Sequence, residues 1–218
     1  MDFFNFAKAI EQGIYDFMMW VFFYPYTLIR TLIFPVATLR YVADQAGLDT
    51  DRAFEDAMRP SIFIFVSIAI GSLLVPLDSQ QVAEIKGSTL GTFVASSWFG
   101  LLLFRMVGFS MFPLAGAVLF DLSRPGAVSR ATLRVPFYQQ SYICAPFALV
   151  VSPALVHFYS DSRWVLVLFG AAVAWFIGCQ YMFFRQSAAT GRLRAAGLAL
   201  AVFLIGWVGL VTISLIVG

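Results

Sequence analysis

One arginine stands alone in a strongly apolar stretch of the chain. Residues 100–116 read GLLLFRMVGFSMFPLAG, and Arg105 is the only charged residue among them. A charged side chain inside a bilayer is costly, and it reaches the interface, pairs with another charge or faces a polar cavity. The long stem of Arg105 allows its guanidinium to snorkel to the interface. Alternatively, Arg105 is buried against Glu84, Asp78 or Asp161, so that Arg105, Glu84 and Asp161 form the candidate intramembrane polar site.

The other residues that carry chemistry do not form a catalytic or metal-binding pattern. His157 is the only histidine, and no second nitrogen or carboxylate ligand lies at metal-binding spacing from it. Cys144 and Cys179 both fall within apolar runs, which favours structural thiols. The sequence contains no Ser-His-Asp set and no phosphate-binding loop. We therefore expect a protein that is not an enzyme and that has no cofactor and no metal.

The composition is that of an integral membrane protein. Hydrophobic residues make up 61% of the 218 residues and charged residues 12%, whereas soluble domains have about 45–50% and about 25%. The formal charge of +2 argues against nucleic acid as a partner, so the expected partners are membrane lipids and other membrane subunits or further copies of the chain. Arginine outnumbers lysine by twelve to two, which favours a bacterial source and hence the inner membrane.

The apolar runs predict an all-α polytopic bundle of five transmembrane spans over residues 60–218. These spans are 60–75, a stretch within 89–120, 137–158, 164–184 and 196–217. Arginine and lysine alternate between the connecting segments, so the positive-inside rule places the N-terminus in the cytoplasm and the C-terminus outside.

The run 89–120 is longer than a bilayer requires, because 32 helical residues extend about 48 Å against a core of about 30 Å. Asp121 marks the expected inner boundary, and counting back about twenty residues places the outer edge near Leu101. Arg105 then lies about one turn inside the outer boundary.

The segment before these spans is amphipathic. Residues 1–40 place apolar side chains at helical spacing, which predicts interfacial helices that lie on a membrane or on the protein's own spans, broken by Pro25 and Pro35. A sixth span over 15–36 is the alternative. Residues 41–59 follow as a solvated cytoplasmic linker.

Two stretches carry small residues at four-residue spacing, which allows close helix packing. They contain Gly87, Gly91 and Ala95, and Gly170, Ala174 and Gly178. The pattern does not indicate whether the partner helix belongs to the same chain or to another subunit.

The topology, together with two short stretches, resembles the Yip family of five-span membrane proteins. The stretches are DAMRP (56–60), with Asp56 and Pro60 in an acidic-x-x-x-Pro element before the first span, and SYICAPFAL (141–149), with Tyr142 and Pro146 in the third span. The likeness covers residues 56–218 and is that of a bacterial relative. It implies a cytoplasmic N-terminal region and five spans, and eukaryotic members of the family associate with Rab GTPases.

Two functions fit these observations. The first is a non-enzymatic scaffold or accessory subunit of a membrane assembly, which the amphipathic N-terminus and the small-residue faces favour. The alternative is a transporter, channel or lipid-moving protein with a polar path near Arg105. A transport path needs polar residues through the full membrane depth, whereas in this sequence they cluster near the ends of the spans.

Overall fold

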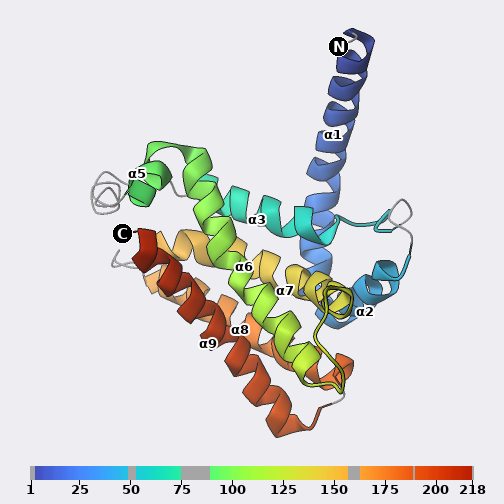
Figure 1. Cartoon of the computed structure of the whole chain (residues 1–218), viewed down its shortest axis with the longest axis vertical. Coiled ribbons are helices and arrows are strands. Elements are labelled where there is room, and N and C mark those ends of the chain that lie inside the picture. The colour runs from blue at the N-terminus through green and yellow to red at the C-terminus, as the bar shows by residue number, and fades with distance from the viewer. Residues whose placement is uncertain (1–2, 49–52, 75–88, 157–162, 189, 218) are drawn as a thin grey trace.

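The structure is a computed structural model, which describes residues 3–48, 53–74, 89–156, 163–188 and 190–217. These residues fold as helices joined by turns (Figure 1). The helices are α1 (Phe3–Ile33), α2 (Pro35–Ala46), α3 (Pro60–Leu74), α5 (Thr89–Ser96), α6 (Trp98–Leu122), α7 (Arg130–Val156), α8 (Arg163–Ser187) and α9 (Arg192–Val217). The expected all-α class is confirmed.

The helices α3, α6, α7, α8 and α9 lie side by side and alternate in direction (Figure 1). Helix α5 and the C-terminus lie at one end of this bundle, which we call the α5 end. Helix α2 and the connection between α6 and α7 lie at the other, which we call the α2 end. Helices α6, α8 and α9 are long and apolar enough to cross a bilayer, so a membrane protein is indicated. Helix α3 is apolar but has only 15 residues.

Helix α7 is the central helix, because it packs against α1, α2, α3, α6 and α8. Every residue from Gln139 to Ala148 is buried. This environment explains why α7 carries more polar residues than α3, α6 and α8, since side chains between helices can bond to protein groups while lipid-facing ones cannot.

Aromatic rings fill the middle of the bundle. Phe112 of α6 contacts Phe147 of α7 and Phe176 of α8 at centroid distances of 5.3 and 5.8 Å. Phe147 and Phe176 lie 4.4 Å apart, and Trp207 of α9 contacts Phe112 at 6.2 Å. We call Phe112, Phe147, Phe176 and Trp207 the aromatic layer. Edge-to-face and tilted pairs of this kind add stability beyond the apolar area that they bury.

A sharp turn of the backbone at Ser97 divides the long apolar run 89–120 into the helices α5 and α6. Ser97 has extended backbone angles, and its side-chain oxygen accepts a hydrogen bond from the Gly100 amide at 3.0 Å, which caps α6. A Cβ on Gly100 would lie 2.5 Å from the Phe93 carbonyl oxygen, so only glycine fits there. The helix that remains, α6, has 25 residues, about 37 Å, and it ends beside the predicted inner boundary.

Two expectations for the N-terminal region are wrong. Pro25 does not break the helix, because α1 runs without interruption from Phe3 to Ile33, and the exposed position of Pro25 lets its ring face outward. Pro35 does separate α1 from α2. The linker 41–59 is not simply solvated: its first residues extend α2, and later side chains are buried, namely Ala53, Phe54, Ala57 and Met58.

Candidate functional site

Arg105 lies on the inward face of α6. It shares this face with Leu102, Phe109 and Phe112, and only 9% of its surface is exposed. The interpretation of a snorkelling side chain with its stem in lipid does not fit, because protein covers the stem. Nη1 of Arg105 is buried and has no hydrogen-bond partner in the described part of the chain.

The predicted partners of Arg105 cannot be placed. Glu84, Asp78 and Asp161 all lie outside the described residues, as does His157. Pairing of Arg105 with one of these carboxylates therefore stays a prediction.

A second polar group joins α7 and α8 deeper in the bundle. Gln140 Nε2 donates to Gln180 Oε1 at 2.9 Å, and Gln180 Nε2 donates to Gln140 Oε1 at 2.6 Å. Both side chains are fully buried. Gly116 of α6 lies against them, and a Cβ at that position would overlap the Gln140 amide. The pair is therefore a three-helix junction in which each amide satisfies the other.

The aromatic layer separates these two polar groups. Along α6, Arg105 is followed two turns later by Phe112 and one turn after that by Gly116, which are steps of about 10 and 6 Å. Phe112 belongs to the aromatic layer, while Gly116 contacts Gln140. The polar groups of the described bundle interior are thus interrupted by a ring of apolar contacts.

The predicted small-residue face of α8 makes no close helix contact in the described part of the chain, whereas the face at Gly87, Gly91 and Ala95 stays a prediction. An added Cβ at Gly170 or Gly178 would meet nothing within 4 Å, and Ala174 is exposed. Gly91 is buried, Gly87 lies outside the described residues, and the side chain of Ala95 is not described.

Other glycines, which the sequence reading missed, allow the helices to approach. Gly206 and Gly209 of α9 lie against Phe112 and Met111 of α6, and Gly71 of α3 lies against Ser152 of α7. The signal for the first contact is the three-residue spacing in GWVG (206–209). A search for four-residue spacing alone does not detect it.

Hydrogen bonds fix the segment before α3 to α1 and α7. The Tyr142 hydroxyl donates to the Met58 carbonyl, and the Met58 amide donates to Thr27 Oγ1 at 3.1 Å. Phe54 has a φ of +65°, and its amide donates to Gln45 Oε1 at 2.9 Å. These bonds hold residues 53–58 in a fixed conformation despite a left-handed backbone that a phenylalanine rarely adopts.

The rings around this segment strengthen the attachment of α1. Tyr24 of α1 lies 5.7 Å from Phe63 of α3, which lies 5.1 Å from Tyr142 of α7. Ser67 donates to the Phe63 carbonyl, so the Tyr24 hydroxyl donates to Ser67 Oγ at 3.1 Å. Burial raises the pKa of Tyr24, which keeps this donor protonated. We call these contacts, with those of Met58, the aromatic clamp.

The clamp joins the two stretches that carry the family resemblance. Tyr142 lies in the second stretch and bonds to Met58 in the first. Pro60 is buried and begins α3, as its position before an apolar run predicts, and Pro146 is buried inside α7. Asp56 is exposed.

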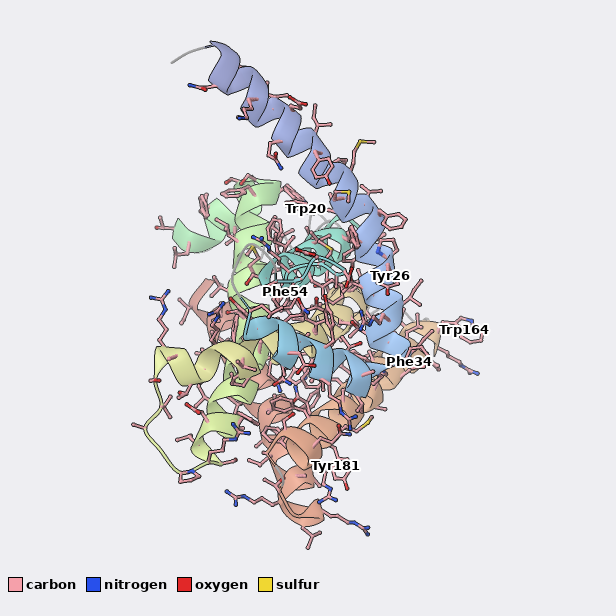
Figure 2. All side chains as sticks on the ribbon, turned by 90° about the vertical axis from the view of Figure 1, so that its right-hand side faces the viewer. Trp20, Tyr26, Phe34, Phe54, Trp164 and Tyr181 are labelled. Atoms are coloured by element: carbon pink, nitrogen blue, oxygen red, sulfur yellow. The ribbon has the colours of Figure 1, made fainter. Side chains whose placement is uncertain are left out.

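The contacts of the aromatic clamp lie outside the N-terminal half of α1. Figure 2 shows this half extending away from the other helices, whereas Trp20, Tyr26 and Phe34 mark the part that lies beside the bundle. Its large apolar side chains are exposed, namely Phe6, Ile10, Ile14, Tyr15, Phe17, Met18, Val21 and Phe22. The alternative that α1 packs on the protein's own spans is therefore wrong for these residues.

In the described ranges, no group of three or more histidine, cysteine, aspartate and glutamate side chains could hold a metal ion. Cys144 and Cys179 are buried free thiols.

Comparison of the chain with protein families, with curated proteins and with solved structures gives no match.

Proposed function

We propose that the chain is a non-enzymatic scaffold or accessory subunit of a membrane assembly, which presents the N-terminal half of α1 to a partner subunit. The observation that carries this proposal is the apolar face of α1, whose large side chains between Phe6 and Phe22 are exposed with few exceptions. Monomeric soluble proteins rarely expose such a face, and exposed apolar patches mark sites of interaction with proteins or membranes.

The attachment of α1 supports a docking role. Thr27 and Thr31 are buried, Tyr24 lies in the aromatic clamp, and Trp175 of α8 donates to the Leu32 carbonyl at 3.3 Å. A helix held at one end by such contacts presents the other end in a defined direction. Binding then needs little ordering of the helix itself, which favours affinity.

The aromatic layer argues against the alternative of a transporter or channel. A conduction path near Arg105 would have to pass the rings that separate it from Gln140 and Gln180. Those two amides are moreover bonded to each other rather than directed at a free cavity.

We propose five spans for the bundle, in a bacterial inner membrane, with the α2 end in the cytoplasm. Helix α7 has 27 residues, about 40 Å, and its burial removes the need for an entirely apolar surface. Helix α3 is short but lies along α7 and not against lipid alone. The α2 end carries most of the arginines, which the positive-inside rule places in the cytoplasm; they include Arg124, Arg130, Arg134, Arg185, Arg192 and Arg194.

Cysteine labelling from outside the cell tests this topology. The background replaces Cys144 and Cys179 with serine, and single cysteines are introduced at Ser162, Gly126 and Gly191. We expect labelling at Ser162 and after Gly218 and protection at the other two positions. Outside labelling at Gly191 would rule out five spans with this orientation.

A charge substitution on α1 tests the docking role. The double variant Ile14→Asp with Phe17→Asp places two carboxylates on the apolar face, with a loss of about 1.5–3 kcal/mol of apolar burial for each side chain. The matched control is Asn5→Asp with Ala9→Asp, which adds two carboxylates to the opposite face of the same helix. We expect the first variant to lose co-purifying subunits in native mass measurements in mild detergent and the control to retain them.

Equal masses for both variants would contradict the scaffold role of α1. Unchanged protection of residues 1–36 against protease in the Ile14→Asp, Phe17→Asp variant would instead favour the sixth span.

A further inference from the structure

A groove of about 870 Å³ lies between α6 and the first turns of α7. Leu114 and Ala117 line it from α6, and Arg130, Leu133, Arg134 and Phe137 line it from α7. The four α7 residues lie at positions i, i+3, i+4 and i+7, so they share one face of the helix. One wall of the groove therefore carries two guanidinium groups beside apolar side chains.

The groove exists because the start of α7 diverges from the end of α6. Figure 2 shows the first turns of α7 leaving the bundle, with the connection between the two helices spanning the gap. On the opposite face of α7, Thr132 Oγ1 donates to Asp121 Oδ2 at 2.5 Å and ties the two helix ends together. Pro136 removes a backbone hydrogen bond at the point where α7 joins the bundle, which permits a bend.

In the described part of the chain, no carboxylate pairs with the two guanidinium groups of the groove. Arg130 and Arg134 are exposed and form no ion pair within the ranges that the structure describes. The Arg134 guanidinium lies 5.7 Å from the centre of the Tyr138 ring. Arg130 is the first residue of α7, where the helix dipole adds partial positive charge.

We propose that this groove binds an anionic phospholipid. Its phosphate lies between the guanidinium groups of Arg130 and Arg134, and an acyl chain follows Leu133, Phe137 and Leu114 toward the bilayer core. From Arg130 to Phe137 the helix rises about 10 Å, which matches the step from a headgroup to the first part of a chain. A soluble phosphate ester would leave the apolar part of the groove empty.

The depth of the groove fits this occupant. Leu114 is exposed and lies two turns inside the C-terminal end of α6, a helix long and apolar enough to span. Arg130 and Arg134 lie beyond that end, near the predicted inner boundary at Asp121. The arrangement places guanidinium groups at headgroup level and apolar side chains below them, as amphipathic residues prefer at an interface.

The test measures lipid retention by native mass spectrometry after purification in mild detergent and incubation with phosphatidylglycerol or phosphatidylcholine. Each arginine near an anionic surface is worth about a fivefold change in affinity, so Arg130→Ala with Arg134→Ala should weaken phosphatidylglycerol binding roughly 25-fold. The control Arg192→Ala with Arg194→Ala removes two exposed arginines from the start of α9 at the same end of the bundle. These residues do not line the groove, and the attraction falls off within a Debye length, so the control should change binding less than about threefold.

A second variant keeps the charges and fills the groove. Ala131 is exposed and lines the groove between the two arginines, so Ala131→Trp should fill this part of the groove and weaken phosphatidylglycerol binding while leaving both arginines in place. Equal losses in the two arginine variants, or equal retention of phosphatidylcholine and phosphatidylglycerol, would overturn the proposal. Glycerol phosphate that displaces the lipid at equal concentration would also overturn it, since the acyl chain would then contribute nothing.

Discussion

Arg105 and the Gln140–Gln180 pair are both polar groups inside an apolar bundle, and they differ in how they are satisfied. Each glutamine amide donates to the other and accepts from it. Arg105 has a buried nitrogen for which the described residues offer no acceptor. The two regions lie on opposite sides of the aromatic layer, about 16 Å apart along α6.

This difference indicates a structural role for the glutamine pair, whereas the role of Arg105 depends on an acceptor that the described residues do not supply. A buried pair whose hydrogen bonds are all made stabilises a specific arrangement of helices. Its net contribution to stability is modest, because the amides also find partners in the unfolded state within the membrane. A buried donor without an acceptor costs free energy, roughly 1–3 kcal/mol. We therefore assign the glutamine pair to the architecture, and we look for the acceptor of Arg105 in segments or partners beyond the described residues.

The largest effect is expected from Gly116→Ala. The added methyl group would overlap the Gln140 amide, so Gln140 must move and its bonds to Gln180 are lost. Overpacking and the lost pair together should lower the free energy of unfolding by about 2–3 kcal/mol. Thermal unfolding in detergent measures the change.

Gly178→Ala is the matched control for this substitution. Gly178 also lies within a helix, but an added Cβ meets nothing within 4 Å. Alanine there should leave the chain unchanged or stabilise it by about 0.5–1 kcal/mol through helix propensity. A loss as large as that of Gly116→Ala would show that Gly178 packs against another subunit.

The next effect is expected from Gln140→Met, which keeps the side-chain length and removes the amide. Gln180 is then buried with an unpaired amide, at a cost of about 1–2 kcal/mol. The double variant Gln140→Met with Gln180→Met should recover most of this loss, because both polar groups are gone. Additive losses in the double-mutant cycle would mean that the pair does not couple α7 to α8.

The sequence predicted the helices far better than their contacts. Pro60 begins α3 where expected, and α6 ends at Leu122, beside the predicted boundary at Asp121. These limits follow from local chemistry, since prolines and charges act within one or two turns of a helix end. The turn at Ser97 also has a local signal, because serine is a common residue before the start of a helix. The apolar run continues on both sides of Ser97, so hydropathy alone does not indicate a break.

The contacts of the site depend on which helices meet. Periodicity assigns Gln140 and Gln180 to helix faces but does not indicate that these faces oppose each other across α7 and α8. The same limit explains why the sequence pattern favours Gly170 and Gly178 for packing over Gly206 and Gly209. A proline inside a helix removes one backbone hydrogen bond, so the sequence predicts a break at Pro25. The exposed position of Pro25 leaves room for its ring, and the helix continues.

The smallest effect is expected from substitutions of Arg105. Their effect on stability shows whether Arg105, like the glutamine pair, has a buried partner. Leucine at this position removes a buried charge whose Nη1 has no acceptor in the described chain. Since the insertion cost of an arginine is about 2.5–3.5 kcal/mol at mid-bilayer and less near an interface, Arg105→Leu should leave the stability unchanged or raise it by about 1 kcal/mol. Arg105→Lys should be nearly silent, because it keeps the charge and the described residues offer Nη1 no acceptor that an ammonium would lose. Both are measured by thermal unfolding in detergent.

A loss of about 3–5 kcal/mol in Arg105→Leu would mean that a carboxylate has been left buried without its partner. Glu84, Asp78 and Asp161 are the candidates, and combining the leucine with Glu84→Gln, Asp78→Asn or Asp161→Asn in turn would identify which one restores stability. Arg105→Lys should then be damaging as well, because an ammonium cannot replace the planar two-point grip of a guanidinium on a carboxylate. In such a pair the Arg105 guanidinium would have a hydrogen-bond acceptor, as each glutamine amide has. Stability lost in the leucine variant without rescue by any of the three would instead direct attention to a polar cavity and strengthen the transport alternative.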